Sequence, residues 1–179
     1  LAAQVPAEEP LAVILVGGGA RSGKSRYAIA LAEVHGDRLG FVATAQPADE
    51  EMRERVEAHR RQRGPQFITI EEPVDIARVI EERAAQFDAI VVDCVTLWLS
   101  NLMLTGDRDV MAEVDRLVKV AGDAPTSLVF VTNEVGCGIV PENDLARRFR
   151  DIAGFANQRI AEVSTRVYWM VFGCPLRVK

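Results

Sequence analysis

The chain contains the sequence Gly18-Gly19-Ala20-Arg21-Ser22-Gly23-Lys24-Ser25, which matches the pattern G-x-x-x-x-G-K-S. An apolar run, Leu11 to Val16, precedes it, and a helix-like stretch, Arg26 to Glu33, follows it. In this strand–loop–helix setting, glycines let successive backbone N–H groups face one concavity, and the positive end of the helix dipole faces the same anion. The stretch therefore predicts a loop that binds the phosphates of a nucleoside triphosphate.

Two side chains of this loop have roles that the pattern defines. Lys24 can reach the β- and γ-phosphates as a catalytic cation, and the Ser25 hydroxyl can ligate Mg²⁺. A second segment, Ala89-Ile90-Val91-Val92-Asp93, has the form of a Walker B strand, whose Asp holds the magnesium ion or its waters. Alone, such a strand can end in Asp merely to form a turn or a cap. Because a phosphate loop lies upstream, we interpret Asp93 as the metal partner of Ser25.

Short runs rich in apolar residues alternate with longer amphipathic stretches, which is the pattern of a parallel sheet covered by helices. Several runs are nearly continuous in Val, Ile, Leu or Phe, as expected for strands buried on both faces. The predicted strands are Ala12–Val16, Leu39–Ala43, Gln66–Ile70, Ala89–Val92, Ser127–Thr132 and Arg166–Val171. The predicted helices are Lys24–Val34, Asp49–Arg63, Asp75–Gln86, Trp98–Leu104, Val110–Ala121 and Asn143–Val163. The sequence therefore predicts the α/β class, with a mostly parallel sheet flanked by helices.

Length and composition favour one domain. At 179 residues the chain is long enough for one well-buried core and short for two. We assign residues 11–179 to this domain and residues 1–10, rich in Ala, Pro and Glu, to a flexible N-terminal tail. Hydrophobic residues make up 49% of the chain and charged residues 26%, which excludes a largely disordered protein.

Charge, hydropathy and cysteine spacing exclude several functional classes. The net charge of −5 and the pI near 5.2 argue against a protein that binds nucleic acid through bulk positive charge. The longest apolar stretch, Ala89 to Leu104, is interrupted by polar residues and is shorter than the ~20 residues that a membrane-spanning helix needs. Three well-separated cysteines form no C-x-x-C pair, so neither a disulfide framework nor a zinc site is predicted. We expect a cytoplasmic protein without a membrane span.

The two histidines have different surroundings. His35 stands beside Gly36 at a predicted helix end, where an ordinary role at the helix terminus is favoured. His59 lies near the end of the predicted helix Asp49–Arg63 and is followed by Arg60-Arg61-Gln62-Arg63. Arginine pairs bidentately with phosphate oxygens, and a neutral imidazole can attack phosphorus and carry the group covalently. The alternative is a histidine at the margin of an apolar stripe beside a solvated charge run, and this segment alone leaves both open.

Several polar segments follow predicted strands. In open α/β sheets, ligands lie beyond the carboxyl ends of the strands, so these segments are expected to line one crevice. The loop Val131–Pro141 can fold over a ligand or serve only as a connection, and the helix Leu145–Gln158 can face a subunit neighbour, an anionic substrate or solvent. The segments of the expected crevice are Gly17–Ser25, Thr44–Gln46, Glu71–Glu72, Asp93 and Thr132–Gly138.

A set of motifs spans nearly the whole chain, from about Val13 to Gly173. They are Gly18-Gly-Ala-Arg-Ser-Gly-Lys-Ser25; Ala43-Thr44-Ala45-Gln46; Asp49-Glu-Glu-Met52 with Arg55-Val56 and His59-Arg60; Val91-Val-Asp-Cys-Val-Thr-Leu-Trp-Leu-Ser-Asn101; and Thr132-Asn-Glu-Val-Gly136 with Gly138-Ile-Val-Pro141 and Phe149-Arg-Asp151. Together they resemble the bifunctional adenosylcobinamide kinase / adenosylcobinamide-phosphate guanylyltransferase family of cobalamin biosynthesis. The phosphate loop is shared with many enzymes, whereas the Asp-Cys-x-Thr-Leu-Trp and Asn-Glu-Val-Gly segments are far more specific.

The resemblance implies a RecA-like P-loop NTPase fold, a homotrimer with sites near subunit boundaries, and two reactions. In the first, ATP or GTP phosphorylates the aminopropanol hydroxyl of adenosylcobinamide. In the second, GMP from GTP is attached to adenosylcobinamide phosphate through a GMP-histidine phosphoramidate, which gives adenosylcobinamide-GDP and pyrophosphate. His59 is the position that matches the family's nucleophile.

The motif and the resemblance together give the expected site. The catalytic residues are His59 and Lys24, and the ligands of Mg²⁺ are Ser25 and Asp93. The expected nucleotide-binding residues are Gly17, Gly18, Gly19, Ala20, Arg21, Ser22, Gly23, Lys24, Ser25, Ala43, Thr44, Ala45, Arg60, Arg61, Gln62, Arg63, Glu71 and Asp93.

Two other functions are compatible with the phosphate loop. One is a P-loop small-molecule kinase without nucleotidyl transfer, which the arginines beside His59 disfavour. The other is a non-enzymatic, nucleotide-dependent switch, which the lack of an extra partner-binding segment disfavours. The sequence leaves open the nucleotide preferred in the kinase step and the residues that hold the corrinoid.

Overall fold

A seven-stranded, mostly parallel sheet forms the centre of the computed structural model, which describes residues 11–46, 50 and 63–179. The strands lie in the order β3-β2-β4-β5-β1-β6-β7, and only β7 runs antiparallel to its neighbour. The strands are β1 (Val13–Gly18), β2 (Leu39–Ala43), β3 (Phe67–Glu71), β4 (Ala89–Asp93), β5 (Ser127–Val131), β6 (Arg166–Val171) and β7 (Cys174–Arg177). The helices are α1 (Lys24–Glu33), α3 (Ile76–Arg83), the 3₁₀ turn η1 (Ala84–Gln86), α4 (Val95–Thr105), α5 (Val110–Asp123) and α6 (Asp144–Val163).

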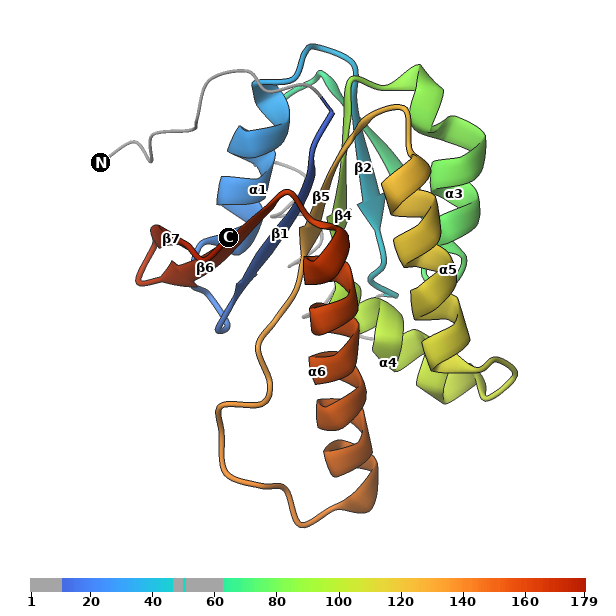
Figure 1. Cartoon of the computed structure of the whole chain (residues 1–179), viewed down its shortest axis with the longest axis vertical. Coiled ribbons are helices and arrows are strands. Elements are labelled where there is room, and N and C mark those ends of the chain that lie inside the picture. Colours follow the sequence, from blue (N-terminus) through green and yellow to red (C-terminus); the bar gives the residue numbers. More distant parts are fainter. Residues whose placement is uncertain (1–10, 47–49, 51–62) are drawn as a thin grey trace.

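Helices cover both faces of the sheet. Helix α1 lies on one face, and α3, α5 and α6 pack on the other, as Figure 1 shows. The strand period of two sends alternate side chains to opposite faces, so Ile14 and Val16 pack with α1 whereas Leu15 packs in the other core. The α/β class predicted from the apolar runs is confirmed, and the runs are continuous because the central strands are buried on both sides.

Most predicted boundaries agree with the structure to within one or two residues, and β2 and β6 begin and end as predicted. Strand β7 was not predicted. It forms a hairpin with β6 through Phe172 and Gly173, whose φ angles are 51° and 83°. Two consecutive residues with positive φ are typical of the two-residue hairpin turn that matches strand twist. The signal available in the sequence was Gly173, between two short β-rich runs.

Two predicted helices differ from the structure. Helix α4 begins at Val95 rather than at Trp98, because the Cys94 side chain accepts a hydrogen bond from the backbone N–H of Leu97 and so caps the helix. The predicted helix Asp49–Arg63 lies outside the described residues except at Glu50, which is helical, and Arg63, which lies in a bend and not in a helix. The assignment of residues 1–10 to a flexible tail also falls outside the described residues.

His35 contacts the amino edge of the sheet, in addition to its predicted place at the end of a helix. Its Nδ1 lies 3.2 Å from the hydroxyl of Ser127, the first residue of β5. Burial, and to a smaller extent the charge of Arg166, lower the pKa of His35 below its usual value. The neutral ring is therefore the form that fits the fold.

This lowered pKa predicts a pH dependence of stability. Since the unfolded chain binds a proton at His35 more readily than the folded chain, the free energy of unfolding should fall as pH falls below about 6.5. The loss of stability occurs between that unfolded value and the lowered folded pKa. Above the unfolded pKa, the contribution of His35 to stability is fully present. Urea midpoints measured across pH 5 to 8 should fall less steeply for His35→Gln than for the wild type. An identical slope in both proteins would contradict this role.

Candidate active site

The phosphate loop leads from the end of β1 into α1, and two of its positions require glycine. Gly18 and Gly23 have φ angles of 145° and 94°, which L side chains rarely adopt. A Cβ at Gly18 would also lie 2.8 Å from the carbonyl oxygen of Met170. Gly23 caps α1 without a side-chain hydrogen bond to its first amides. Those N–H groups are thus placed to bind an anion at the positive end of the helix.

Lys24 folds back over this loop. Its side chain is 7% exposed, and Nζ donates a hydrogen bond to the carbonyl oxygen of Gly19 at 2.6 Å. Burial lowers the pKa of Lys24, while the electrostatic effect of Asp93, and a smaller one of Cys94, act in the opposite direction. The ammonium group is therefore within electrostatic range of the carboxyl end of β4. This interaction was not predicted from the sequence, which paired Asp93 with Ser25 through the magnesium ion.

The register of the sheet brings other predicted residues to the same edge. Glu71 pairs with Ala43, and Ala43 pairs with Asp93, so these three residues stand side by side at the ends of β3, β2 and β4. Asp93 pairs in turn with Val131 of β5, which pairs with Val16 just before the loop. Neighbouring strands are about 4.8 Å apart, so the row from β1 to β3 spans about 19 Å. That length suits an extended nucleotide.

Ser25 and Asp93 provide a suitable donor set for a divalent cation. Both residues are half-buried, one in the first turn of α1 and the other at the last position of β4. A hydroxyl and a carboxylate are hard oxygen ligands, which Mg²⁺ prefers when it also binds phosphate oxygens and water. Among the described residues, no group of three or more His, Cys, Asp or Glu side chains is placed to hold a metal ion.

Thr44 was predicted to bind nucleotide, but its side chain connects two strand ends. It is fully buried, and its hydroxyl donates to the Cys94 carbonyl oxygen and accepts from the Cys94 N–H, each at 2.8 Å. The Asp93–Cys94 peptide bond is cis. The hydroxyl of Thr44 therefore holds the end of β2 against the residue that follows Asp93. The N–H of Thr44 also donates to the carbonyl oxygen of Asp93, at 3.2 Å. A nucleotide contact at Thr44 and Ala45 stays a prediction.

Replacing Thr44 with valine should destabilise the fold while preserving side-chain shape. The variant leaves the buried N–H of Cys94 without its acceptor and removes one of the two hydrogen bonds of the Cys94 carbonyl oxygen, which should lower the free energy of unfolding by about 2 kcal/mol. Urea denaturation measures this loss. Thr165→Val is the matched control, because the exposed hydroxyl of Thr165 makes one hydrogen bond, to the carbonyl oxygen of Val13, and water can replace it. Equal losses in the two variants would contradict the special role of Thr44.

Helix α4 positions the loops that follow β2 and β3. The Asn101 amide donates to the carbonyl oxygens of Thr44 and Pro73, at 2.8 and 2.9 Å, and Trp98 Nε1 donates to the carbonyl oxygen of Val74 at 2.7 Å. The two side chains are three residues apart and share a helix face. In the sequence, this segment contributed only to the family resemblance, and its role in positioning the two loops was not predicted. The signal was a polar amide and an indole in an otherwise apolar helix.

The loop after β5 is anchored to the phosphate loop at its start. The N–H of Glu134 donates to the carbonyl oxygen of Gly18 at 3.1 Å, and the N–H of Asn133 donates to the hydroxyl of Thr96 at 2.7 Å. Thr132 donates to the side-chain oxygen of Asn157 at 2.8 Å, which connects the loop to α6. The first part of the loop is thus fixed against the phosphate loop and α6, and its folding over a ligand stays a prediction.

The proposed nucleophile and most of its arginine run lie outside the described residues. These are His59, Arg60, Arg61 and Gln62. Arg63 is described, and its guanidinium carbon lies 3.9 Å from the centroid of the Phe41 ring of β2. This cation–π contact uses one face of the guanidinium.

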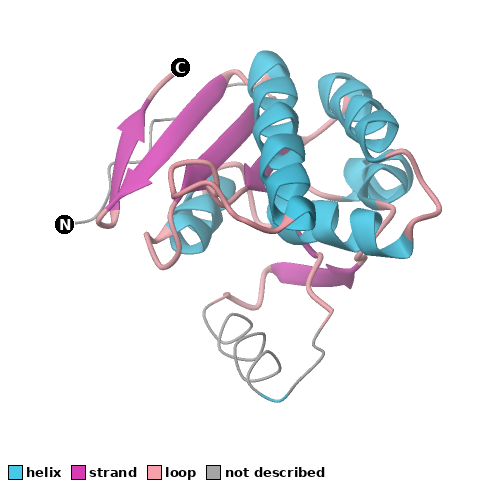
Figure 2. Cartoon of the chain, turned by 90° about the horizontal axis from the view of Figure 1, so that it is seen from below, coloured by secondary structure: helices cyan, strands magenta, loops and turns pink. Residues whose placement is uncertain are grey.

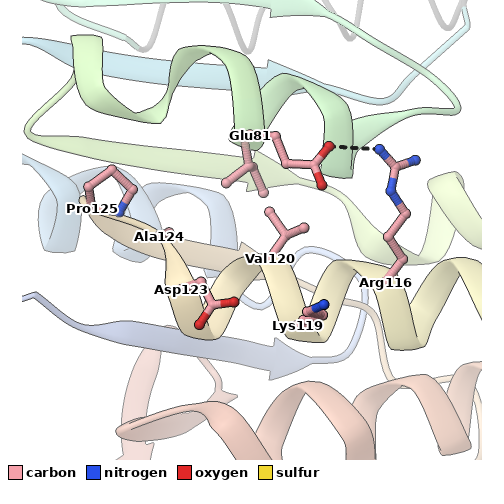
Figure 3. Close-up of a pocket in the computed structure, with 8 residues that line it drawn as sticks. Glu81, Arg116, Lys119, Val120, Asp123, Ala124 and Pro125 are labelled. Carbon is pink, nitrogen blue, oxygen red and sulfur yellow. Dashed lines mark hydrogen bonds and ion pairs between the residues drawn. The ribbon is translucent and has the colours of Figure 1, made fainter.

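A surface groove lies away from this edge. It is located between α3 and α5, and its walls carry charges of both signs, with Arg116 paired to Glu81 at 2.8 Å (Figure 3). Pro125 precedes β5, so the groove is near the amino ends of the strands, opposite to the phosphate loop. The groove is lined by Ile80, Glu81, Arg116, Lys119, Val120, Asp123, Ala124 and Pro125.

Comparison with known proteins identifies the family. The family model described as "Cobinamide kinase / cobinamide phosphate guanyltransferase" matches residues 14–178. The chain belongs to this family. A bifunctional adenosylcobalamin biosynthesis protein, CobP of Pseudomonas aeruginosa, is 42% identical over 166 residues, covering 92% of this chain and 96% of that protein. The protein of the same description, CobU, from Salmonella typhimurium is 40% identical over 93% of this chain and 99% of that protein.

Solved structures confirm the P-loop NTPase fold at much lower sequence identity. The RadB recombinase has a TM-score of 0.52 and 19% identity, covering 89% of this chain and 74% of that chain. An ATPase from a bacterial type III secretion system has a TM-score of 0.57 and 12% identity, covering 89% of this chain and 51% of that one. The chain thus shares its fold with these two proteins. The family resemblance inferred from its motifs is confirmed by the family model and the relatives.

Two further findings concern cellular context. No helix in the described part of the chain is long and apolar enough to cross a bilayer. Cys94, Cys137 and Cys174 are all free thiols, and Cys94 is buried, which raises its pKa to about 11.

Proposed function

We propose that this chain catalyses two consecutive reactions on a corrinoid. It phosphorylates adenosylcobinamide with ATP or GTP, and it then transfers GMP from GTP to the product, which gives adenosylcobinamide-GDP and pyrophosphate. The observation that carries this proposal is the meeting of the phosphate loop, Lys24 and Asp93 at one sheet edge in a chain of this bifunctional family. Both reactions need a site that binds a triphosphate and stabilises charge on phosphorus.

In the kinase step, the substrate hydroxyl attacks the γ-phosphorus, and the bond from that phosphorus to the β–γ bridging oxygen breaks. The hydroxyl proton is released, and the nucleoside diphosphate leaves. The backbone amides of the loop and Lys24 would stabilise the negative charge on the transferring group. Mg²⁺ held by Ser25 and Asp93 would neutralise further charge on the phosphate oxygens.

In the guanylyl step, a ring nitrogen of His59 attacks the α-phosphorus of GTP, and pyrophosphate leaves. The phosphate of adenosylcobinamide phosphate then attacks the same phosphorus, and the P–N bond breaks. Arg60, Arg61 and Arg63 would pair with the phosphate oxygens, since guanidinium groups keep their charge and bind bidentately. The covalent histidine splits one difficult transfer into two easier steps.

The remaining parts of the site belong to the same proposal. We assign the guanine nucleotide to the loop and to the row formed by Ala43, Glu71 and Asp93, with Gln62 beside the arginines. The assembly is a homotrimer with sites near subunit boundaries, residues 11–179 act as one domain, and the enzyme works in the cytoplasm, where ATP and GTP are available.

Turnover assays test this function directly. The full chain is incubated with adenosylcobinamide, Mg²⁺ and γ-labelled ATP, and then with α-labelled GTP. We expect label first in adenosylcobinamide phosphate and then in adenosylcobinamide-GDP, with release of pyrophosphate. Formation of the first product alone would indicate a kinase without nucleotidyl transfer. Nucleotide binding without either product would indicate a nucleotide-dependent switch.

A further inference from the structure

The hairpin turn between β6 and β7 is fixed to the outer side of the phosphate loop. The N–H of Gly173 donates to the carbonyl oxygen of Ser22 at 3.1 Å. Strand β6 also pairs with β1 up to the loop itself, with Met170 opposite Gly18. Figure 1 shows the hairpin at the edge of the sheet, beside the turn that leads from β1 to α1. The two turns therefore form one local surface.

Phe172 occupies the tip of this turn and is 98% exposed. It is the most exposed large hydrophobic residue in the described part of the chain. An isolated exposed apolar side chain needs no explanation in general, but this ring stands next to a phosphate-binding loop. An exposed aromatic ring can provide a stacking surface for a nucleobase.

The expected direction of the triphosphate follows from the strand order. Asp93, the proposed magnesium ligand, ends β4 on the β5 side of β1, so the γ-phosphate end is expected to face that side. The α-phosphate and the nucleoside of a phosphoryl donor then extend to the other side, where β6 and β7 lie. Arg26 lies beside both turns, because a Cβ built on either Gly23 or Gly173 would be 3.8 Å from its guanidinium Nη2.

We propose that Phe172 is the stacking platform for the nucleobase of the phosphoryl donor in the kinase step, with Arg26 beside its α-phosphate. This inference rests on the proposed kinase function. Stacking on a phenyl ring does not distinguish adenine from guanine, because both purines present a π face. The subsite therefore accepts a purine nucleoside triphosphate of either kind.

This subsite lies apart from the row assigned to the guanine nucleotide of the second step. Ala43 and Glu71 stand at the ends of β2 and β3, on the opposite side of β1 from the hairpin. One phosphate loop thus serves two nucleotides whose bases extend in opposite directions. The proposal concerns only the donor of the γ-phosphate.

The test compares ATP with inorganic tripolyphosphate, which has the phosphates but no base. Binding of each in the presence of Mg²⁺ is measured by calorimetry for the wild type, Phe172→Ala and Phe172→Trp. We expect Phe172→Ala to weaken ATP binding and to raise KM for ATP about tenfold, while tripolyphosphate binds as in the wild type. Phe172→Trp should restore ATP affinity, and its indole emission should change when ATP binds.

Controls separate this inference from the function on which it rests. Phe155→Ala removes another exposed phenyl ring, on α6, and should leave ATP binding unchanged. Equal ATP affinity in the wild type and Phe172→Ala would overturn the stacking role, and so would equal losses of ATP and tripolyphosphate, which would indicate a distorted loop. If the wild type bound neither compound, the kinase function itself would fail. The melting temperature of Phe172→Ala should match that of the wild type, since the ring buries almost no surface.

Discussion

Replacing His59 with alanine is expected to abolish covalent labelling of the protein by α-labelled GTP and to abolish formation of adenosylcobinamide-GDP. The reason is that the variant lacks the ring nitrogen that would form the P–N bond, whereas the phosphate loop is intact. Phosphorylation of adenosylcobinamide by ATP should therefore continue. The measurement is the retention of label on the denatured protein, which for a phosphoramidate should survive alkali and be lost in acid.

His35 supplies a matched control for this experiment, because it is the only other histidine in the chain. His35→Gln should label with α-labelled GTP to the same extent as the wild type, since its ring lies at the amino edge of the sheet beside Ser127. Label that persists in His59→Ala, or disappears in His35→Gln, would contradict the assignment of the nucleophile.

Replacing Lys24 with methionine should lower kcat/KM by at least about 100-fold in both reactions, because each reaction places negative charge on phosphate oxygens held by the same loop. Methionine retains an unbranched apolar stem in this largely buried position. The change removes the ammonium group and its hydrogen bond to the Gly19 carbonyl oxygen. Steady-state assays of each reaction, with melting temperatures measured with and without ATP, separate lost catalysis from lost folding.

Lys119→Met is the corresponding control, since Lys119 is exposed on α5 beside the groove of Figure 3, on the opposite edge of the sheet. It should retain wild-type kinetics and the rise in melting temperature on ATP binding. Lys24→Met should fold normally but lose that rise, because ligand binding stabilises only a protein that still binds. Wild-type kinetics in Lys24→Met would contradict the role of Lys24 in phosphoryl transfer.

Several features of the fold could be predicted because their signals are local. The segments that form β4 and β5 are continuous runs of apolar residues. Such short runs are typical of strands that are buried on both faces, so these strands could be predicted. The boundary of α4 was missed because its start depends on the thiol of Cys94, which is rarely a cap. The hairpin partner β7 was missed because a short, mostly exposed strand carries little hydrophobic signal.

The structural role of the Thr44 hydroxyl could not be predicted from the sequence. The family segment predicts a nucleotide contact at Thr44, which stays a prediction, and it gives no sign that the hydroxyl binds the backbone of Cys94. Nothing within the sequence around Thr44 indicates that Cys94 lies beside it, because 50 residues separate the two. The same reason hid the contacts of Asn101 with the Thr44 and Pro73 carbonyl oxygens.

The view in Figure 2, turned by 90° from that of Figure 1, shows the strands and helices around the carboxyl edge where these distant segments meet. The row of Glu71, Ala43 and Asp93 exists only because β2 lies between β3 and β4 in the sheet. A different strand order would have separated the same residues without changing any local pattern.

The sequence by itself determined the phosphate loop, because a glycine-rich turn, a lysine and a helix start within eight consecutive residues leave few other conformations. It also determined the α/β class and, through its motifs, the enzyme family. Only the tertiary structure decided that Lys24 lies toward Asp93, that Thr44 holds two strand ends together, and that Gly173 bonds to Ser22. The physical reason is that these contacts depend on strand order and register, which arise when the whole sheet packs and not from any one segment.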